Sequence, residues 1–261
     1  ATAGQENVAE DKLGILEPLR ASLVLAQAGA SYMTGLVGNV SIPVYSGSNV
    51  GWAGEVTAAS DGAGTFSEVN LEPKRLTAYI DVSKQFLIQD SNSAEEMLKR
   101  DIVSAISNKL EATILGTAAG SATQPAGLLN GVTADTAAVT YTDFVNMEAT
   151  LGEKNVRGDI KFIVSPSAKA VLKSTAKNQN SFIMEGNEVN GYPVLCTSAV
   201  AGKGIVYGNF ADLVIGQWGG IDLTVDPYTQ AANGKVRLVI NAYFDAKPRR
   251  AEAFVKKVLK A

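Results

Sequence analysis

The sequence has no histidine and a single cysteine, Cys196, among its 261 residues. The lack of histidine excludes Ser-His-Asp and Cys-His catalysis, the HExxH zinc motif and every histidine-ligated metal. A lone cysteine excludes an intrachain disulfide framework and a cysteine-based zinc site. Its apolar neighbours favour a small buried hydrophobe over a reactive thiol. We therefore expect no metal site in this chain.

Positive charge is also scarce. The formal net charge is −3, whereas tight nucleic-acid binding usually requires a clearly basic domain, so we expect at most weak contacts to nucleic acid. No charged residue occurs between Arg20 and Glu55, but polar side chains interrupt the apolar ones too often for a membrane-spanning helix. Such an uncharged stretch suits burial against neighbouring chains, because interface cores are depleted of charge. A lone extended loop of poor solubility is the alternative.

The first twelve residues, ATAGQENVAEDK, lack the basic start and apolar run of a signal peptide. Because the sequence begins at Ala1, we hypothesise that a longer precursor is cleaved there. Removal of a methionine or trimming of the chain would leave the same start.

A glycine-rich segment follows a predicted strand over residues 36–45. Asp61–Gly64 reads DGAG, which predicts a turn between a strand ending near Val56 and one beginning near Thr65. This hairpin has few large apolar side chains and no core of its own. Because isolated hairpins are only marginally stable in water, we expect another molecule to support it.

The rest of the chain alternates helices and strands and predicts an α+β fold. Period-two alternation predicts strands from Leu76 and over residues 235–248. Apolar residues every four positions predict a helix over Ala94–Gly116, with Ser93 and Glu96 as its capping box. Further helices are predicted over Thr142–Leu151 and Ser167–Ala176, with strands over 160–166, 191–200, 204–208 and 212–227 and a closing segment over 251–260.

Catalytic and cofactor motifs are absent or incomplete. No GxxxxGK[ST] loop occurs, and no GxGxxG opens a helix after a strand, so we expect no cofactor. Ser174 and Lys177 have S-x-x-K spacing without its partner motifs and fit the polar end of a surface helix. We interpret Trp218 as a local packing residue and Trp52, on the thin hairpin, as an intermolecular anchor. The nearby carboxylates Asp212, Asp222 and Asp226 are interpreted as surface or turn residues.

From about Leu19 to the end, the order of these segments resembles the major capsid proteins of tailed phages with the HK97 fold. The resemblance rests on the uncharged lead-in, the hairpin SGSNVGWAGEVTAASDGAGTFSEVNL, the strand LTAYIDVSKQFLIQDS, the helix ending in GTAAGSATQPAGLLN, and the close VRLVINAYFDAKPRRAEAFVKK. It implies an N-terminal arm over 1–35 and an extended loop, the E-loop, over 36–75. It also implies a peripheral domain over 76–119 and 230–261 with a spine helix over 94–116, and an axial domain over 120–229.

The resemblance further implies a structural protein and not an enzyme. Its copies would form the pentamers and hexamers of an icosahedral virion capsid, assembled in the host cytoplasm around double-stranded DNA after removal of an N-terminal scaffold segment. A portal, a maturation protease and a decoration protein are the other implied partners, with no membrane involved. The residues expected to contact other subunits from the E-loop are Trp52, Glu55, Val56, Phe66 and Val69.

Some members of that family join subunits by an isopeptide bond between an E-loop lysine and a neighbour's asparagine. Here no lysine occurs between Lys12 and Lys74, so we predict a shell without covalent cross-links. Two other functions remain open at this point. One is a protein compartment of the encapsulin type with the same fold, and the other is a hydrolase using Ser174 and Lys177 or a carboxylate pair.

Overall fold

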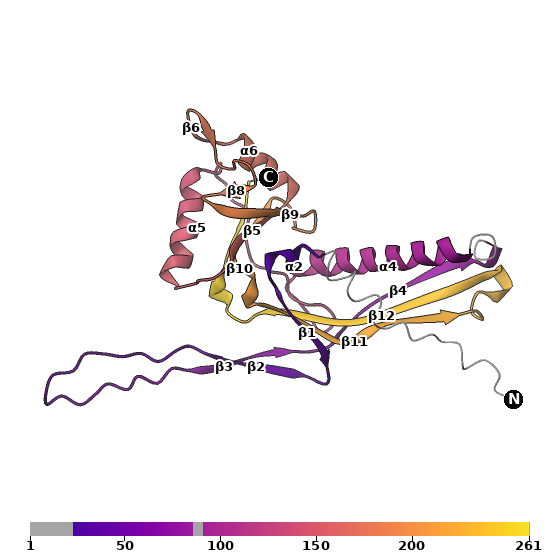
Figure 1. Cartoon of the computed structure of the whole chain (residues 1–261), viewed down its shortest axis with the longest axis horizontal. Coiled ribbons are helices and arrows are strands. Elements are labelled where there is room, and N and C mark those ends of the chain that lie inside the picture. The colour runs from indigo at the N-terminus through magenta and orange to yellow at the C-terminus, as the bar shows by residue number, and fades with distance from the viewer. Residues whose placement is uncertain (1–22, 86–90, 261) are drawn as a thin grey trace.

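A computed structural model of the chain describes residues 23–85 and 91–260. A long sheet with one helix along it extends to one side, a second α/β unit stands above the other end, and a thin hairpin projects in the opposite direction from the helix (Figure 1). This arrangement confirms the α+β class.

The long sheet has four strands in the order β1-β11-β12-β4. These are β1 (Ser31–Leu36), β11 (Leu213–Asp226), β12 (Lys235–Pro248) and β4 (Lys74–Ser83). Strand β12 pairs antiparallel with both neighbours, whereas β1 pairs parallel with β11. The alternating apolar residues of β4 and β12 thus form one side of the sheet facing the helix, as their period-two pattern predicts.

Helix α4 (Ser91–Ile114) runs along this sheet and corresponds to the predicted spine helix. Its predicted apolar stripe is buried at Ile102, Ile106, Leu110 and Ile114. The helix begins at Ser91, so Ser93 lies in its first turn and is not the N-cap that the capping-box pattern predicts.

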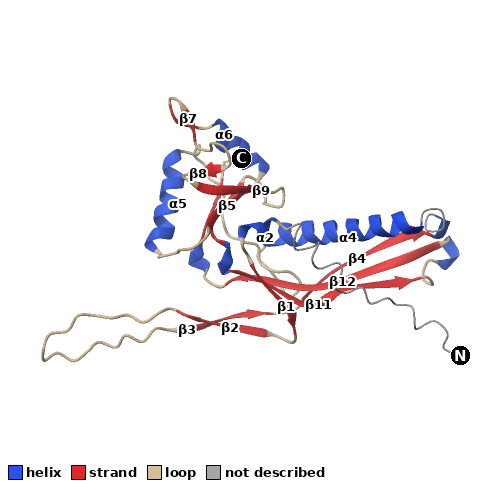
Figure 2. Cartoon of the chain, in the orientation of Figure 1, coloured by secondary structure: helices blue, strands red, loops and turns tan. Residues whose placement is uncertain are grey.

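The second unit contains a five-stranded sheet in the order β13-β10-β5-β9-β8, flanked by two helices (Figure 2). Tyr207 of β10 stacks on Phe162 of β5 with ring centroids 4.1 Å apart, and Phe144 of α5 packs against the same ring. Its elements are α5 (Tyr141–Glu153), β5 (Ile160–Val164), α6 (Pro166–Ser174), β6 (Ala176–Asn178), β7 (Ser181–Phe182), β8 (Glu188–Val189), β9 (Tyr192–Cys196), β10 (Gly204–Asn209) and β13 (Phe254–Val258).

Helices α5 and α6 and the strands β5, β9, β10, β11, β12 and β13 confirm the corresponding sequence predictions. The sheets cut across the domain ranges expected from the resemblance, however. Strand β11, within 120–229, belongs to the four-stranded sheet, and β13, within 230–261, belongs to the five-stranded sheet. Three short 3-10 helices, η1 (Phe210–Asp212), η2 (Ala231–Asn233) and η3 (Ala251–Ala253), connect these strands.

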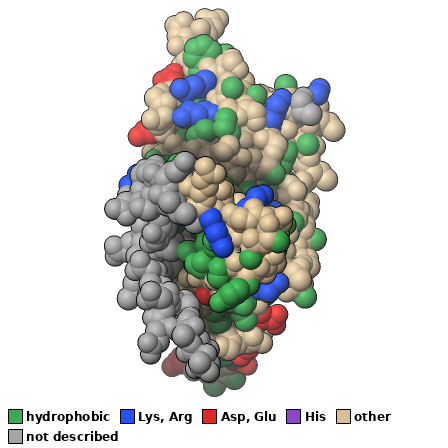
Figure 3. Space-filling view, turned by 90° about the vertical axis from the view of Figure 1, so that its right-hand side faces the viewer, with side chains coloured by type: hydrophobic (Ala, Val, Ile, Leu, Met, Phe, Trp, Pro, Cys, Tyr) green, Lys and Arg blue, Asp and Glu red, His purple; other side chains and the backbone are tan. Residues whose placement is uncertain are grey.

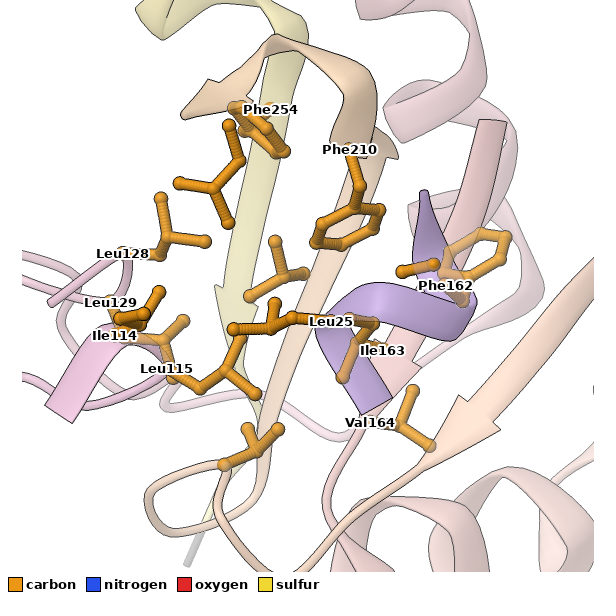
Figure 4. Close-up of a cluster of buried hydrophobic side chains, with 14 of the residues drawn as sticks. Leu25, Ile114, Leu115, Leu128, Leu129, Phe162, Ile163, Val164, Phe210 and Phe254 are labelled. Atoms are coloured by element: carbon orange, nitrogen blue, oxygen red, sulfur yellow. The ribbon is translucent and has the colours of Figure 1, made fainter. Parts of the chain in front are cut away.

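One continuous hydrophobic core joins the two units, and helix α2 (Val24–Ala28) lies at its centre (Figure 4). Leu25 of α2 lies between the end of α4, with Ile114 and Leu115, and strand β5, with Ile163 and Val164. The N-cap residue of α2, Leu23, has no side chain that can cap the helix. The Glu111 carboxylate of α4 caps it instead, because it accepts a hydrogen bond from the Leu25 amide at 3.1 Å. The sequence patterns did not predict α2 or β1.

Candidate functional site: an exposed hairpin on a fixed root

The hairpin projects away from the rest of the described chain (Figure 1). Strands β2 (Val40–Tyr45) and β3 (Phe66–Leu71) pair antiparallel, and residues 46–65 continue beyond them as two arms. The Asn49 amide donates to the Gly62 carbonyl oxygen at 2.9 Å, which joins the arms far from the strands. The hairpin is therefore longer than its two strands.

The tip of this hairpin is at residues 54–57, where the Thr57 amide donates to the Gly54 carbonyl oxygen at 3.0 Å. The predicted turn at Asp61–Gly64 is wrong, because these residues lie on the returning arm opposite 47–49. Asp61 forms only a local turn, in which its Oδ1 accepts from the Ala63 amide at 2.9 Å. Val56 accordingly belongs to the tip and does not end a strand.

The glycines on the returning arm are needed because the two backbones approach closely. A Cβ on Gly64 would lie 2.1 Å from the Gly47 carbonyl oxygen, and one on Gly62 would lie 2.0 Å from that of Asn49. Where the arms leave the strands, the Tyr45 and Phe66 rings pack 4.6 Å apart, and the Gly64 amide donates to the Tyr45 hydroxyl at 3.0 Å. The arms are thus held to each other without a core.

The apolar side chains of the hairpin point into solvent. Trp52 is fully exposed, Val56 is 98% exposed and Phe66 is 79% exposed even with the Tyr45 contact. Of the five predicted contact residues, Trp52, Glu55, Val56 and Phe66 are exposed, and Val69 is half-buried opposite Ile42. All three charged side chains of residues 37–71, Glu55, Asp61 and Glu68, are acidic.

The root of the hairpin is rigidly attached to the long sheet. Leu71, Val214 and Trp218 form a small buried cluster, and the Trp218 indole N–H donates to the Gly38 carbonyl oxygen at 2.6 Å. These contacts confirm the local packing role predicted for Trp218. At the entry to β4, the buried Lys74 ammonium lies 2.9 Å from the buried Asp245 carboxylate.

Asp245 makes further contacts that position the hairpin. Its Oδ2 accepts from the Glu72 amide at 3.1 Å, and its Oδ1 accepts from the Ala246 amide at 3.0 Å. The Lys247 ammonium also donates to the Asn70 carbonyl oxygen at 2.6 Å. The direction of the hairpin is therefore set by polar contacts to β12, of which those of Asp245 are at least partly buried and that of Lys247 is exposed, while the outer length of the hairpin lies in solvent.

A second exposed apolar surface lies at the opposite end of the long sheet, the end that faces the viewer in Figure 3. Tyr79, Val225 and Tyr228 are exposed there. The Arg237 guanidinium lies over the Tyr79 ring and pairs with both oxygens of Asp81, and this pairing lowers the pKa of the Asp81 carboxyl. Sequence patterns did not single out this surface, because each residue belongs to an ordinary alternating strand or turn.

The candidate catalytic residues do not form a site. The Ser174 hydroxyl donates to the Val171 carbonyl oxygen, and Lys177 lies over the Tyr141 ring at 4.2 Å, so the two side chains have separate partners. Asp226 caps the turn after β11 by accepting from the Tyr228 and Thr229 amides. Asp212 lies in η1 and Asp222 in β11, opposite Asn241.

Residues 23–85 and 91–260 contain no group of three or more His, Cys, Asp or Glu side chains that could hold a metal ion. Within the same ranges, each helix is too short or too polar to span a membrane.

Comparison with known proteins assigns the family. Residues 12–259 match the model of the phage capsid family. The major capsid protein of Halomonas phage phiHAP-1 is 30% identical over 251 residues, which cover 91% of this chain. The chain spans 41% of the length of that relative.

Solved structures share the fold. The capsid of a native GTA particle has a TM-score of 0.73 at 17% identity, covering 90% of this chain and 89% of that one. Mycobacterium phage Bobi has a TM-score of 0.71 at 15% identity, covering 100% and 95%. The capsid fold expected from the sequence is thereby confirmed, and the chain belongs to the phage capsid family.

Proposed function

We propose that this chain is the major capsid protein of a tailed-phage-like particle and that it forms the shell by self-assembly. The observation that carries the proposal is the hairpin, in which Trp52 and Val56 are fully or almost fully exposed on arms with no core. Burying one such side chain is worth about 1.5–3 kcal/mol, a gain that the isolated chain leaves unrealised. The fixed root supports the same reading, because it holds these side chains out in a defined direction.

The hairpin contact is of the head-to-tail kind. A projection on one copy that fits a different surface on the next generates a closed ring when the rotation between copies closes. Pentamers and hexamers are such rings, and we assign them to this chain as capsomers. In this proposal Trp52, Glu55, Val56, Phe66 and Val69 contact a neighbouring subunit.

The contents of the shell follow from charge. A net charge of −3 gives the chain no strong attraction for nucleic acid. Double-stranded DNA inside the particle would therefore make only weak, non-specific contacts with the inner face. The role is structural, with no reaction assigned to any residue.

We also propose that the shell is held together without covalent cross-links, because the hairpin has no lysine to supply an amine. Purified particles boiled in denaturant should give one monomer band on a gel. A ladder of covalent oligomers would refute this part of the proposal.

The shell function is tested by comparing Trp52→Ala with Val145→Ala, a truncation of an exposed side chain on α5. Particles are followed by negative-stain electron microscopy and sedimentation across a range of protein concentrations. Loss of a central aromatic anchor costs about 2 kcal/mol or more, so Trp52→Ala should raise the assembly concentration roughly 30-fold, with Val145→Ala near wild type. A wild-type chain that stays monomeric, or equal assembly of both variants, would contradict the proposal.

A further inference from the structure

Residues 129–132, in the segment that follows α4, form an exposed turn with an Asn-Gly pair at its centre. The Val132 amide donates to the Leu129 carbonyl oxygen at 3.2 Å and closes the turn. Gly131 has a φ of 73° and Asn130 before it has a negative φ, which is the pattern of a type II turn. Asn130 and Gly131 are both exposed, so water reaches both of them.

In an Asn-Gly pair the asparagine side chain can react with the backbone that follows it. The backbone nitrogen of the glycine attacks the side-chain Cγ, and no Cβ on the glycine shields that nitrogen. The attack requires a nitrogen without a hydrogen-bond acceptor and a side chain that can rotate. Within residues 23–85 and 91–260, neither the Gly131 amide nor the Asn130 side chain has a hydrogen-bond partner. Both requirements are therefore met in this turn.

Two other Asn-Gly pairs occur in the sequence, and the fold restrains both of them. The Asn233 side chain donates to the Gln230 side chain at 2.7 Å, and the Gly234 amide donates to a backbone carbonyl oxygen of η2 at 3.1 Å. Asn190 is half-buried in the tight turn between β8 and β9, and its Nδ2 lies 3.5 Å from the Glu148 carboxylate. The three pairs thus have the same composition and differ in their freedom to react.

We propose that Asn130 is a site of spontaneous deamidation, which gives each copy of the chain a slow and irreversible change of charge. The Gly131 nitrogen bonds to Cγ of Asn130, the Cγ–Nδ2 bond breaks, and ammonia leaves with the displaced proton, so that a succinimide ring remains. Water then opens the ring at either of its carbonyl groups to give aspartate or isoaspartate. Either product replaces a neutral amide by a carboxylate, so the formal net charge changes from −3 to −4.

The isoaspartate product also changes the backbone. Its main chain passes through the former side-chain carbon, and the extra atom between Leu129 and Val132 distorts the hydrogen bond that closes the turn. Leu128 and Leu129, directly before the turn, are buried, and Leu129 lies beside Ile114 and Leu115 in the core (Figure 4). The reaction therefore acts on the residues that anchor the segment after α4. It concerns the single chain and does not depend on the proposed shell function.

The test follows deamidation in the folded subunit and in the same chain unfolded in urea. The subunit is kept unassembled so that no neighbouring copy covers the turn. Peptide mass spectrometry gives the deamidated fraction at Asn130, Asn190 and Asn233 over time. In urea the three sites should react at similar rates. In the folded chain Asn130 should react fastest, roughly tenfold faster than Asn233, where two hydrogen bonds must open before attack.

Three variants separate the chemistry from its structural effect. Asn130→Gln should lose the acidic species that accumulates on ion-exchange chromatography, because its longer side chain closes a ring more slowly, whereas the matched control Asn233→Gln should keep it. Asn130→Asp adds the charge without the extra backbone atom, so its urea midpoint should equal that of wild type, and the isolated isoaspartate form should unfold at lower urea.

Two results would overturn the assignment of this site. One is a folded chain in which Asn130 reacts no faster than Asn190 or Asn233, and the other is an Asn130→Gln variant that accumulates the acidic species as fast as wild type. An isoaspartate form as stable as wild type would refute the effect on the core. Because all of these measurements use the unassembled subunit, they leave the proposed shell function to its own test.

Discussion

Removing the Lys74 side chain should destabilise the subunit far more than removing an exposed lysine. The Lys74 ammonium is 8% exposed and the Asp245 carboxylate is 0% exposed, with 2.9 Å between them. Lys74→Met would leave the carboxylate buried without its counter-charge, which typically costs 3–5 kcal/mol. Asp245 keeps its two amide donors from Glu72 and Ala246, so we expect about 3 kcal/mol, the lower end of that range.

The double variant Lys74→Met/Asp245→Asn completes the cycle. It removes both charges and keeps one amide oxygen as an acceptor, but the backbone N–H that faced the lost oxygen and the new side-chain N–H groups are left without acceptors, at about 1–3 kcal/mol for each unsatisfied group. Neither charge is then buried without its counter-charge. The double variant should therefore be more stable than the sum of the two single variants predicts. A coupling energy near zero would show that the two charges do not stabilise each other in the folded chain.

The assay is urea unfolding of the unassembled subunit at one low protein concentration, since assembly would add to the apparent stability. Lys154→Met is the control, because Lys154 and Glu252 are both more than half exposed with 3.9 Å between their charged atoms. Exposed pairs contribute about 0–1 kcal/mol. For a chain of this size, a loss of 3 kcal/mol lowers Tm by roughly 6–12 °C. Equal unfolding midpoints for Lys74→Met and Lys154→Met would refute the reasoning.

Three further predictions concern other parts of the chain. Burial raises the pKa of the Glu111 carboxyl above its usual 4.5. As pH rises through that raised pKa, the folded wild type must hold a buried negative charge and should lose stability relative to Glu111→Gln. Urea midpoints measured across pH 4–8 would show this loss. Gly64→Ala would press a methyl group against the Gly47 carbonyl, and it should impair assembly without lowering the Tm of the subunit. Gly152→Ala in α5 is the control, and it should assemble normally and gain stability of about 0.5–1 kcal/mol. Burial lowers the pKa of Lys256, so Lys256→Met should raise the urea midpoint at pH 7, with the difference shrinking as alkaline pH deprotonates the wild-type amine.

The elements with a long, regular pattern were predictable from the sequence. The four-residue spacing in α4 and the alternation in β4 and β12 each reflect one buried face. These spacings follow from the geometry of the helix or strand itself, so they can be read without knowing which element packs against that face. The hairpin could also be recognised, because a segment with only a few scattered large apolar residues has no continuous apolar face to bury. The exposed position of Trp52 and the buried position of Trp218 followed from that contrast.

The elements that were missed depend on distant residues. Helix α2 has only five residues, too few to be stable alone, and its amides are capped by Glu111 from a different helix. Strand β1 pairs with β11 about 180 residues later in the chain, and nothing in its own sequence marks that pairing. The glycines of Asp61–Gly64 fit a turn equally well, and only the opposite arm shows that they allow two backbones to approach.

The absence of basic residues from the hairpin has a consequence beyond the missing cross-link. Two hairpins with free strand edges and exposed apolar side chains could pair with each other, which is the usual hazard of such edges. Because every charge on the hairpin is acidic, hairpin-to-hairpin pairing brings like charges together and is disfavoured. The acidic charges of the hairpin therefore act against hairpin-to-hairpin aggregation.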